Sequence, residues 1–97
     1  MAIRVIWSQP ALEDFDDILA VIARDKPRAA KALGKRVLEA ARRLARFPAL
    51  GRWVPELKPS AYREILLAPV RVIYRREKDT IIIVHVVRQE RTIDSPS

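Results

Sequence analysis

The sequence predicts an α+β fold: an N-terminal strand, an antiparallel two-helix hairpin and a three-stranded antiparallel meander that together form one curved sheet with the hairpin on one face. Apolar residues recur at steps of three and four only between residues 10 and 46. Alternating, β-branched segments lie before and after that region, and the last three are separated by short turns. With 97 residues, we expect a single domain over residues 1–97.

The first two elements follow from residues 3–25. Residues 3–7 alternate and are rich in β-branched side chains, so they predict a strand. Ser8 is a good N-cap, and Pro10 fits a first helical turn, where its missing N–H costs nothing. We therefore expect a helix over residues 10–24, with an apolar face made of Ala11, Phe15, Ile18 and Ile22.

A second helix follows after a short break. We expect Asp25 to cap it, Pro27 to lie in its first turn and Phe47-Pro48 to end it. The short break makes the two helices an antiparallel hairpin. The expected buried face consists of Ala30, Leu33, Val37, Ala41 and Leu44.

The remaining chain predicts a loop and three strands. Residues 48–60 contain three prolines and a glycine, which are typical of a loop. Tight turns are expected at Ala68-Pro69 and at residues 77–79. The strands they separate are expected at residues 62–67, 70–76 and 80–88.

The first and the last strand are both expected to belong to the sheet. The last strand is apolar on both faces between Ile81 and Val84, which suits a central position. The first strand must join the sheet, because a lone strand would leave its backbone groups unpaired. The tail at residues 89–97 has little to bury and is expected to be disordered.

The net charge of +7 is unevenly distributed. Residues 26–52 carry nine basic side chains against Glu39 alone. Such a basic segment is expected to attract nucleic acid or an acidic protein, although it also fits a solvated helix face. The chain has no cysteine, which removes disulfides and thiolate chemistry and fits a cytoplasmic protein. We expect no membrane association, because no apolar run reaches the length of a span.

The sequence offers few parts for catalysis. His85 is the single histidine, and we interpret it as a strand residue with a satisfied hydrogen bond. We expect no metal site and no cofactor, because there are no clustered ligands and too few glycines for a phosphate-binding loop. The acidic side chains of the first helix are interpreted as a solvated face: Glu13, Asp14, Asp16 and Asp17.

Arginines recur on the predicted strands and are the main candidates for function. Guanidinium groups stay charged and bind phosphate or carboxylate in bidentate pairs. We expect them to converge on the sheet face away from the helices and to bind a target there, although a one-residue slip in register reverses a strand's faces. The alternative is that they pair with Glu56, Glu64, Glu77 or Glu90, of which Glu64 is best placed. The candidate target-binding residues are Arg52, Arg63, Arg71, Tyr74, Arg88 and Arg91.

At these residues the sequence resembles the ParE/RelE superfamily, the toxins of type II toxin–antitoxin modules. The resemblance covers nearly the whole chain. Its strongest parts are Arg63-Glu64-Ile65, the run from Arg71 to Arg75, and His85 with Arg88 three residues later. Further matching pieces are Val5-Ile6-Trp7-Ser8, Asp25-Lys26-Pro27, Gly51-Arg52 and Pro55-Glu56-Leu57.

The superfamily divides by target, and the resemblance favours its ParE-like branch. RelE-like members are ribosome-dependent mRNA endonucleases that use strand lysines, arginines and a C-terminal tyrosine. Here Arg63 and Glu64 stand where a lysine pair is expected, and Asp94 stands at the tyrosine position. The resemblance therefore implies a ParE-like protein that inhibits DNA gyrase by contact and is not an enzyme. In the RelE-like alternative, with ribosome and mRNA as partners, the catalytic residues would be Arg63, Arg71 and Arg88.

Either branch implies a cognate antitoxin, ParD-like for the favoured branch, bound in a toxin–antitoxin hetero-oligomer. Its C-terminal segment is expected to lie on the helical hairpin and sheet, and an acidic segment would be steered by the basic second helix. The candidate antitoxin-binding residues are Leu50, Trp53 and Val54. The alternative interpretation is that Trp53 and Val54 are loop residues folded over the core.

Overall fold

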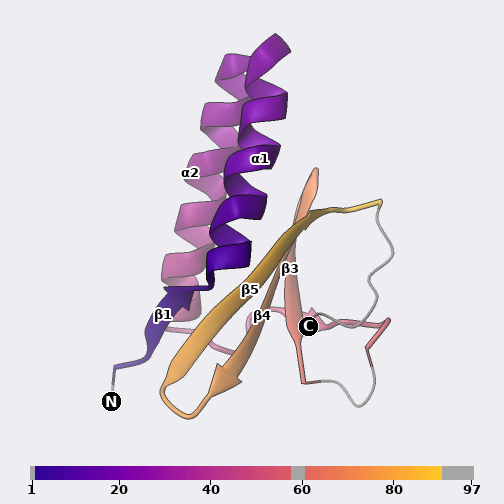
Figure 1. Ribbon diagram of the computed structural model, residues 1–97. Coiled ribbons are helices and arrows are strands. Elements are labelled where there is room, and N and C mark those ends of the chain that lie inside the picture. The colour runs from indigo at the N-terminus through magenta and orange to yellow at the C-terminus, as the bar shows by residue number, and fades with distance from the viewer. Residues whose placement is uncertain (1, 58–60, 91–97) are drawn as a thin grey trace.

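The computed structural model describes residues 2–57 and 61–90 and confirms the α+β class. Its strands form one five-stranded sheet in the order β1-β5-β4-β3-β2, and the two helices stand side by side on one face of it (Figure 1). The elements are β1 (Arg4–Trp7), α1 (Gln9–Asp25), α2 (Pro27–Leu44), β2 (Arg52–Trp53), β3 (Arg63–Leu67), β4 (Val70–Glu77) and β5 (Thr80–Arg88).

Helix α1 begins as the sequence predicts. The Ser8 hydroxyl oxygen accepts a hydrogen bond from the Ala11 amide at 3.2 Å, which satisfies one of the free N–H groups of the first turn. The same hydroxyl donates to the carbonyl oxygen of Val84 at 3.1 Å. The helix cap therefore also attaches the start of α1 to strand β5, between β1 and β4 in the sheet.

The expected cap of α2 is wrong. Asp25 is the last residue of α1, and Lys26 alone separates the helices. The Lys26 amide donates to the Ile22 carbonyl at 2.9 Å and closes α1, while its own carbonyl accepts from the Ala30 amide at 3.1 Å and opens α2. Lysine has no side-chain acceptor for a cap, so Pro27 begins the helix where no N–H needs a partner.

The sheet differs from the prediction in two respects. Strand β1 pairs with β5 in parallel, with Arg4 opposite Thr80 and Trp7 opposite Ile83, so the sheet is mixed and not wholly antiparallel. The predicted loop over residues 48–60 also contains the short strand β2, which pairs antiparallel with β3. Two residues are too few to show an alternating pattern, and patterning carries no information on strand direction.

Two apolar cores lie on opposite faces of the sheet. The larger one lies between the sheet and the helices and includes Phe15, Val37, Leu44, Ile81 and Ile83. The smaller one lies on the other face, where Val54 and Leu57 pack on Ile73. The sheet face away from the helices is therefore partly covered by the segment after β2, seen beside the sheet in Figure 1.

Tyr74 fixes the segment that leads into β2. Its side chain is 1% exposed, and its hydroxyl donates to the Pro48 carbonyl at 2.9 Å and accepts from the Gly51 amide at 2.8 Å. A Cβ atom at position 51 would lie 2.6 Å from the Glu64 carbonyl oxygen and 2.8 Å from the Tyr74 ring. Only glycine permits this close approach between the segment, β3 and β4.

Gly51→Ala should therefore destabilise the fold by about 2–3 kcal/mol, because backbone and a fully packed ring must move to admit the methyl group. Urea unfolding measures this change. Gly34→Ala is the matched control: the new Cβ would lie 3.8 Å from Leu19, and alanine is favoured over glycine inside a helix by about 1 kcal/mol. A Gly51→Ala protein as stable as the Gly34→Ala protein would contradict the close approach.

Candidate functional site

A cluster of two arginines and two glutamates lies on the sheet face away from the helices. We call it the Glu64 cluster: Arg52, Glu56, Glu64 and Arg71. Strand pairing places Arg52 opposite Glu64, and Glu64 opposite Ile73 of the smaller core. The Glu64 carboxylate accepts from Arg71 Nε at 2.6 Å and from Arg52 Nε at 2.7 Å. Glu64 is 1% exposed, so both of its oxygens act inside the protein.

Arg71 is held on two sides by carboxylates. Its two terminal nitrogens donate to the two oxygens of Glu56, each at 2.9 Å, while Nε donates to Glu64. The hydrogen bonds that Arg71 donates to Glu56 raise the pKa of the guanidinium above its ordinary value, and they outweigh the lowering effect of burial. Since the guanidinium is 5% exposed and already neutralised, it cannot present its charge to a ligand.

A second group of side chains surrounds Trp53 on the opposite side of β2. Trp53, Arg63 and Tyr74 lie opposite one another on three neighbouring strands. The Arg63 guanidinium carbon lies 3.7 Å from the centroid of the Trp53 ring, and its NH1 donates to the Gly51 carbonyl at 2.8 Å. Burial raises the pKa of Tyr74, against the lowering effects of the Gly51 hydrogen bond and of the Arg63 charge.

These residues line a small cavity of about 220 Å³ that we call the Trp53 pocket. Trp53 is 52% exposed, so the stacked pair is open to solvent. Two further arginines from the end of β4 face the cavity. The complete lining is Pro48, Ala49, Trp53, Ala61, Arg63, Tyr74, Arg75 and Arg76.

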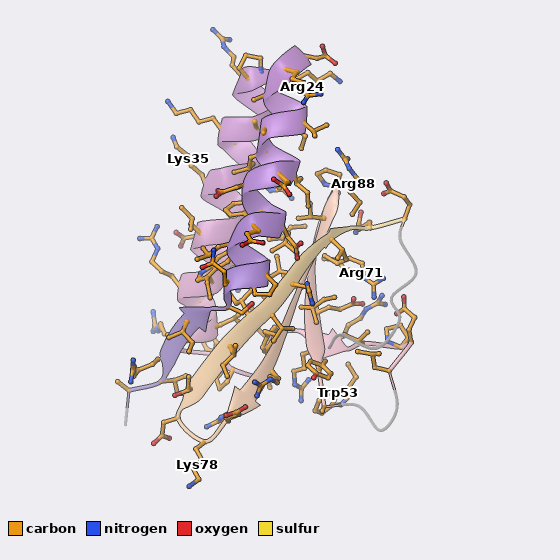
Figure 2. The ribbon with its side chains drawn as sticks, viewed as in Figure 1. Arg24, Lys35, Trp53, Arg71, Lys78 and Arg88 are labelled. Atoms are coloured by element: carbon orange, nitrogen blue, oxygen red, sulfur yellow. The ribbon has the colours of Figure 1, made fainter. Side chains whose placement is uncertain are left out.

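Arg88 lies at a third place, in a groove of about 290 Å³ between α1 and the end of β5. It lines this groove with Asp14, Asp17 and the half-exposed Val21. Figure 2 shows Arg88, Arg71 and Trp53 at separate levels along the sheet. The expectation that the arginines converge on one face is therefore wrong. Arg52 and Arg71 meet at Glu64, whereas Arg63 lies over Trp53 and Arg88 lines the groove beside α1.

His85 is satisfied as predicted, and its partner is an acidic residue of α1. Asp14 Oδ2 lies 2.9 Å from His85 Nδ1 and accepts from the Val86 amide at 3.1 Å. The interpretation of the first-helix acids as a solvated face is wrong for Asp14, which attaches α1 to β5. Periodicity could not reveal this, because the partner lies 71 residues away.

The other predicted site residues divide by burial. Val54 is 0% exposed and packs in the smaller core, as the alternative interpretation of this segment had it, whereas Leu50 and Trp53 are exposed. Tyr74 is buried, and Arg91 lies outside the described residues. The predicted pairing of Glu64 is confirmed. Glu77 pairs with Arg75 of its own strand and not across strands.

The outer surface of α2, expected from the sequence to be basic, also exposes an apolar residue that was not predicted. Leu38 is 51% exposed there and lines two shallow grooves, of about 610 Å³ and 430 Å³, on its two sides. Lys35, Arg36, Arg42 and Arg43 flank the first groove, and Figure 2 shows Lys35 directed away from the sheet. Apolar surface rimmed by charge is typical of a protein-binding site. The sequence signal that could have indicated this site is Leu38, an apolar residue off the predicted buried face of a basic helix.

Metal-ligating side chains do not gather in the part of the chain that the structure describes. Residues 2–57 and 61–90 contain no group of three or more His, Cys, Asp or Glu side chains that could hold a metal ion. Of the candidate arginines, Arg52 and Arg71 pair with carboxylates and Arg63 lies over the Trp53 ring. The His85–Asp14 pair attaches α1 to β5. No helix in the described part of the chain has the length and apolar character required to cross a bilayer.

Comparisons with known proteins agree with this fold. Residues 5–93 match the family model described as ParE toxin of the type II toxin–antitoxin system parDE. None of the curated proteins searched matches the sequence. The fold is similar to a chain of the chromosomal ParDE system from P. aeruginosa, with a TM-score of 0.75 and 21% identity over 91% of this chain and 97% of that one.

Two further solved structures share the fold. The toxin–antitoxin complex RelBE2 from Mycobacterium tuberculosis contains a chain with a TM-score of 0.63 and 20% identity, over 92% of this chain and all of that chain. The YoeB dimer from Staphylococcus aureus gives a TM-score of 0.65 and 17% identity, over 92% of this chain and 98% of that one. At these identities the likeness concerns the fold.

Glu64→Ala should destabilise the fold by about 3 kcal/mol, because it removes one of the carboxylates that compensate the buried charge of Arg71. Thermal and urea unfolding measure the loss. The matched control is Glu39→Ala, which removes an exposed pair with Arg42 on α2 and should cost less than about 0.5 kcal/mol. Equal stability of the two variants would refute the structural role assigned to the Glu64 cluster.

Proposed function

The chain belongs to the ParE toxin family of type II toxin–antitoxin systems, and from that premise we propose that it inhibits DNA gyrase by contact and cuts no nucleic acid. The observation that carries the proposal is the state of Arg71. A nuclease would need this guanidinium to stabilise the charge that develops on a phosphate. Here both glutamates have already taken its donors, so the arginine supports a binding surface and performs no chemistry.

The RelE-like alternative has less support. It requires Arg63, Arg71 and Arg88 to act together on one ribose phosphate. Arg63 lies against Trp53, Arg71 lies in the Glu64 cluster, and Arg88 lines the groove beside α1. Catalytic groups must lie within hydrogen-bond reach of the same reacting atoms, and these three belong to separate sites.

The candidate residues then take different roles. Arg52, Arg63 and Arg88 reach the surface and are proposed to contact the target directly. The buried residues Arg71 and Tyr74 are proposed to support these surface arginines indirectly, because they hold β2 and the Gly51 segment in place. Arg91, beyond the described residues, remains a predicted contact. Since gyrase acts on cellular DNA, the proposed place of action is the cytoplasm.

A cognate antitoxin is the proposed second partner. The exposed Leu38 and the basic side chains around it offer an apolar strip with positive edges, which suits an amphipathic segment rich in acids. Leu50 and Trp53, both exposed, remain proposed contacts farther along the chain. The two proteins would form the hetero-oligomer that neutralises the toxin until the antitoxin is lost.

Purified protein should inhibit gyrase supercoiling in a dose-dependent manner and leave message intact on translating ribosomes. Arg88→Ala should require roughly tenfold more protein for equal inhibition, as expected when an arginine at an interface is lost. Arg24→Ala, at the exposed end of α1, is the matched control and should inhibit like the unchanged protein. Gel analysis of plasmid topoisomers and primer extension on the message give the two readouts.

The two assays separate the alternatives. Codon-positioned cuts that disappear in Arg88→Ala would establish the RelE-like function and overturn the proposal. Absence of any effect on gyrase at excess protein would also count against it. Growth arrest on expression would exclude a housekeeping nucleic-acid-binding role, which instead predicts salt-sensitive binding without toxicity.

A further inference from the structure

We propose that the Trp53 pocket is a receptor for one carboxylate side chain, carried by an apolar segment of the cognate antitoxin. The proposal rests on the function proposed above in one respect, namely that an antitoxin binds this chain. It adds the chemistry of the contact and its place. Since Arg63 is also a proposed target contact, a carboxylate seated on it would block the target surface directly.

The first argument is the geometry of Arg63. Its guanidinium carbon lies 3.7 Å from the centroid of the Trp53 ring, and NH1 is oriented by the Gly51 carbonyl at 2.8 Å. Within residues 2–57 and 61–90, Arg63 has no carboxylate in ion-pair range. The other donors of its planar edge match the two oxygens of a carboxylate, and because the group is preorganised, little entropy is lost on binding.

The second argument is the charge of the pocket. Three arginines line it, and the acidic partner found for this set is Glu77, which pairs with Arg75. Arg76 donates to the Lys78 carbonyl, which carries no net charge. The pocket therefore has an excess of two positive charges. A single incoming carboxylate would reduce this excess and gain a charge-assisted hydrogen bond to Arg63.

The third argument concerns size and favours a protein side chain over a nucleotide. The cavity of about 220 Å³ is smaller than the 300–1,000 Å³, roughly, of small-molecule sites. One face of the Trp53 ring, the natural platform for a base, is already covered by Arg63. Tryptophan and arginine at the centre of an apolar surround are the composition of a protein-binding hot spot.

The fourth argument is continuity with the proposed antitoxin surface on α2. Exposed apolar side chains continue along the chain from Leu38 through Phe47 and Leu50 to Trp53. Arg46 lies over the Phe47 ring at 5.7 Å, so the strip keeps its positive edge past the end of the helix. An acidic, apolar segment that lies along α2 would therefore be led to the Trp53 pocket.

Trp53 itself can report the binding. In a Trp7→Phe protein it is the single tryptophan, since the chain has two. The probes are an acetylated, amidated peptide of Leu-Ala-Glu repeats and its counterpart with Gln in place of Glu. The Glu peptide should shift Trp53 emission with an affinity about tenfold higher than that of the Gln peptide, which is the contribution expected of one charge-assisted pair.

Arg63→Gln should abolish this preference, Arg63→Lys should keep part of it, and Arg24→Gln should leave it unchanged. Equal binding of the two peptides to the Trp7→Phe protein would overturn the proposal, even if the Arg63 variants fail to fold. An emission shift caused by oligouridylate and not by the Glu peptide would also overturn it, because the occupant would then be RNA.

Failure of this inference is distinguishable from failure of the proposed function. Supercoiling inhibition without a preference for the Glu peptide removes the carboxylate receptor and leaves the gyrase proposal standing. A preference for the Glu peptide without any inhibition of gyrase would refute gyrase as the target and leave the carboxylate receptor supported. In the complex with the cognate antitoxin, emission from Trp53 should no longer respond to added Glu peptide, and a continued response would place the antitoxin elsewhere.

Discussion

The buried carboxylate of Glu64 is the constraint on which the surface of this protein depends. It holds Arg71 of β4 and Arg52 of β2 from one position in β3, so three strands meet at one charge. Removing the Glu64 carboxylate would leave the charge of Arg71 buried, and removing Arg71 would leave buried negative charge on Glu64; both are strongly unfavourable. Because successive residues of a strand point to opposite faces, fixing Arg52 on one face also fixes Trp53 on the other. The Glu64 cluster and the Trp53 pocket are thereby coupled through the two residues of β2, Arg52 and Trp53.

This coupling explains how a small sheet can display a rigid surface. Tyr74 and Gly51 supply a second attachment for the same segment through two hydrogen bonds to the tyrosine hydroxyl. Trp53 and Arg63 are then presented by backbone that is held at both ends. Preorganisation of this kind lowers the entropic cost of binding a partner, and it needs no proton transfer. A toxin that acts by contact can be built in this way.

Much of the fold followed from the sequence because it depends on local signals. The Ser8 cap, Pro27 at the start of α2 and the strand over residues 80–88 each have a local physical cause, and the structure confirms them. The direction of β1 and the existence of β2 have no such signal. Both depend on which strands meet after the chain has folded. Asp25 failed as a cap because α1 extends one residue farther than its apolar face requires.

The candidate site was less predictable than the fold. The sequence indicated Glu56 and Glu64 as possible partners of the arginines, but not that both would hold the same one, Arg71. The shift in register between Ile73 and Tyr74, where β4 and β5 are irregular, changes which side chains share a face. Hence the arginines appear as one group in the sequence and lie at three places in the structure.

The central claim is that Arg71 serves structure and not chemistry. Its most direct test replaces Arg71 and its partner Glu56 by uncharged residues of similar volume, Glu56→Leu together with Arg71→Met, and measures growth arrest on expression. This double variant keeps the Glu64–Arg52 pair that fixes β2. Such replacements are often neutral or stabilising, and urea unfolding verifies the fold. We predict that the folded double variant still arrests growth. A folded double variant that has lost toxicity would contradict the account, because the guanidinium itself would then be required.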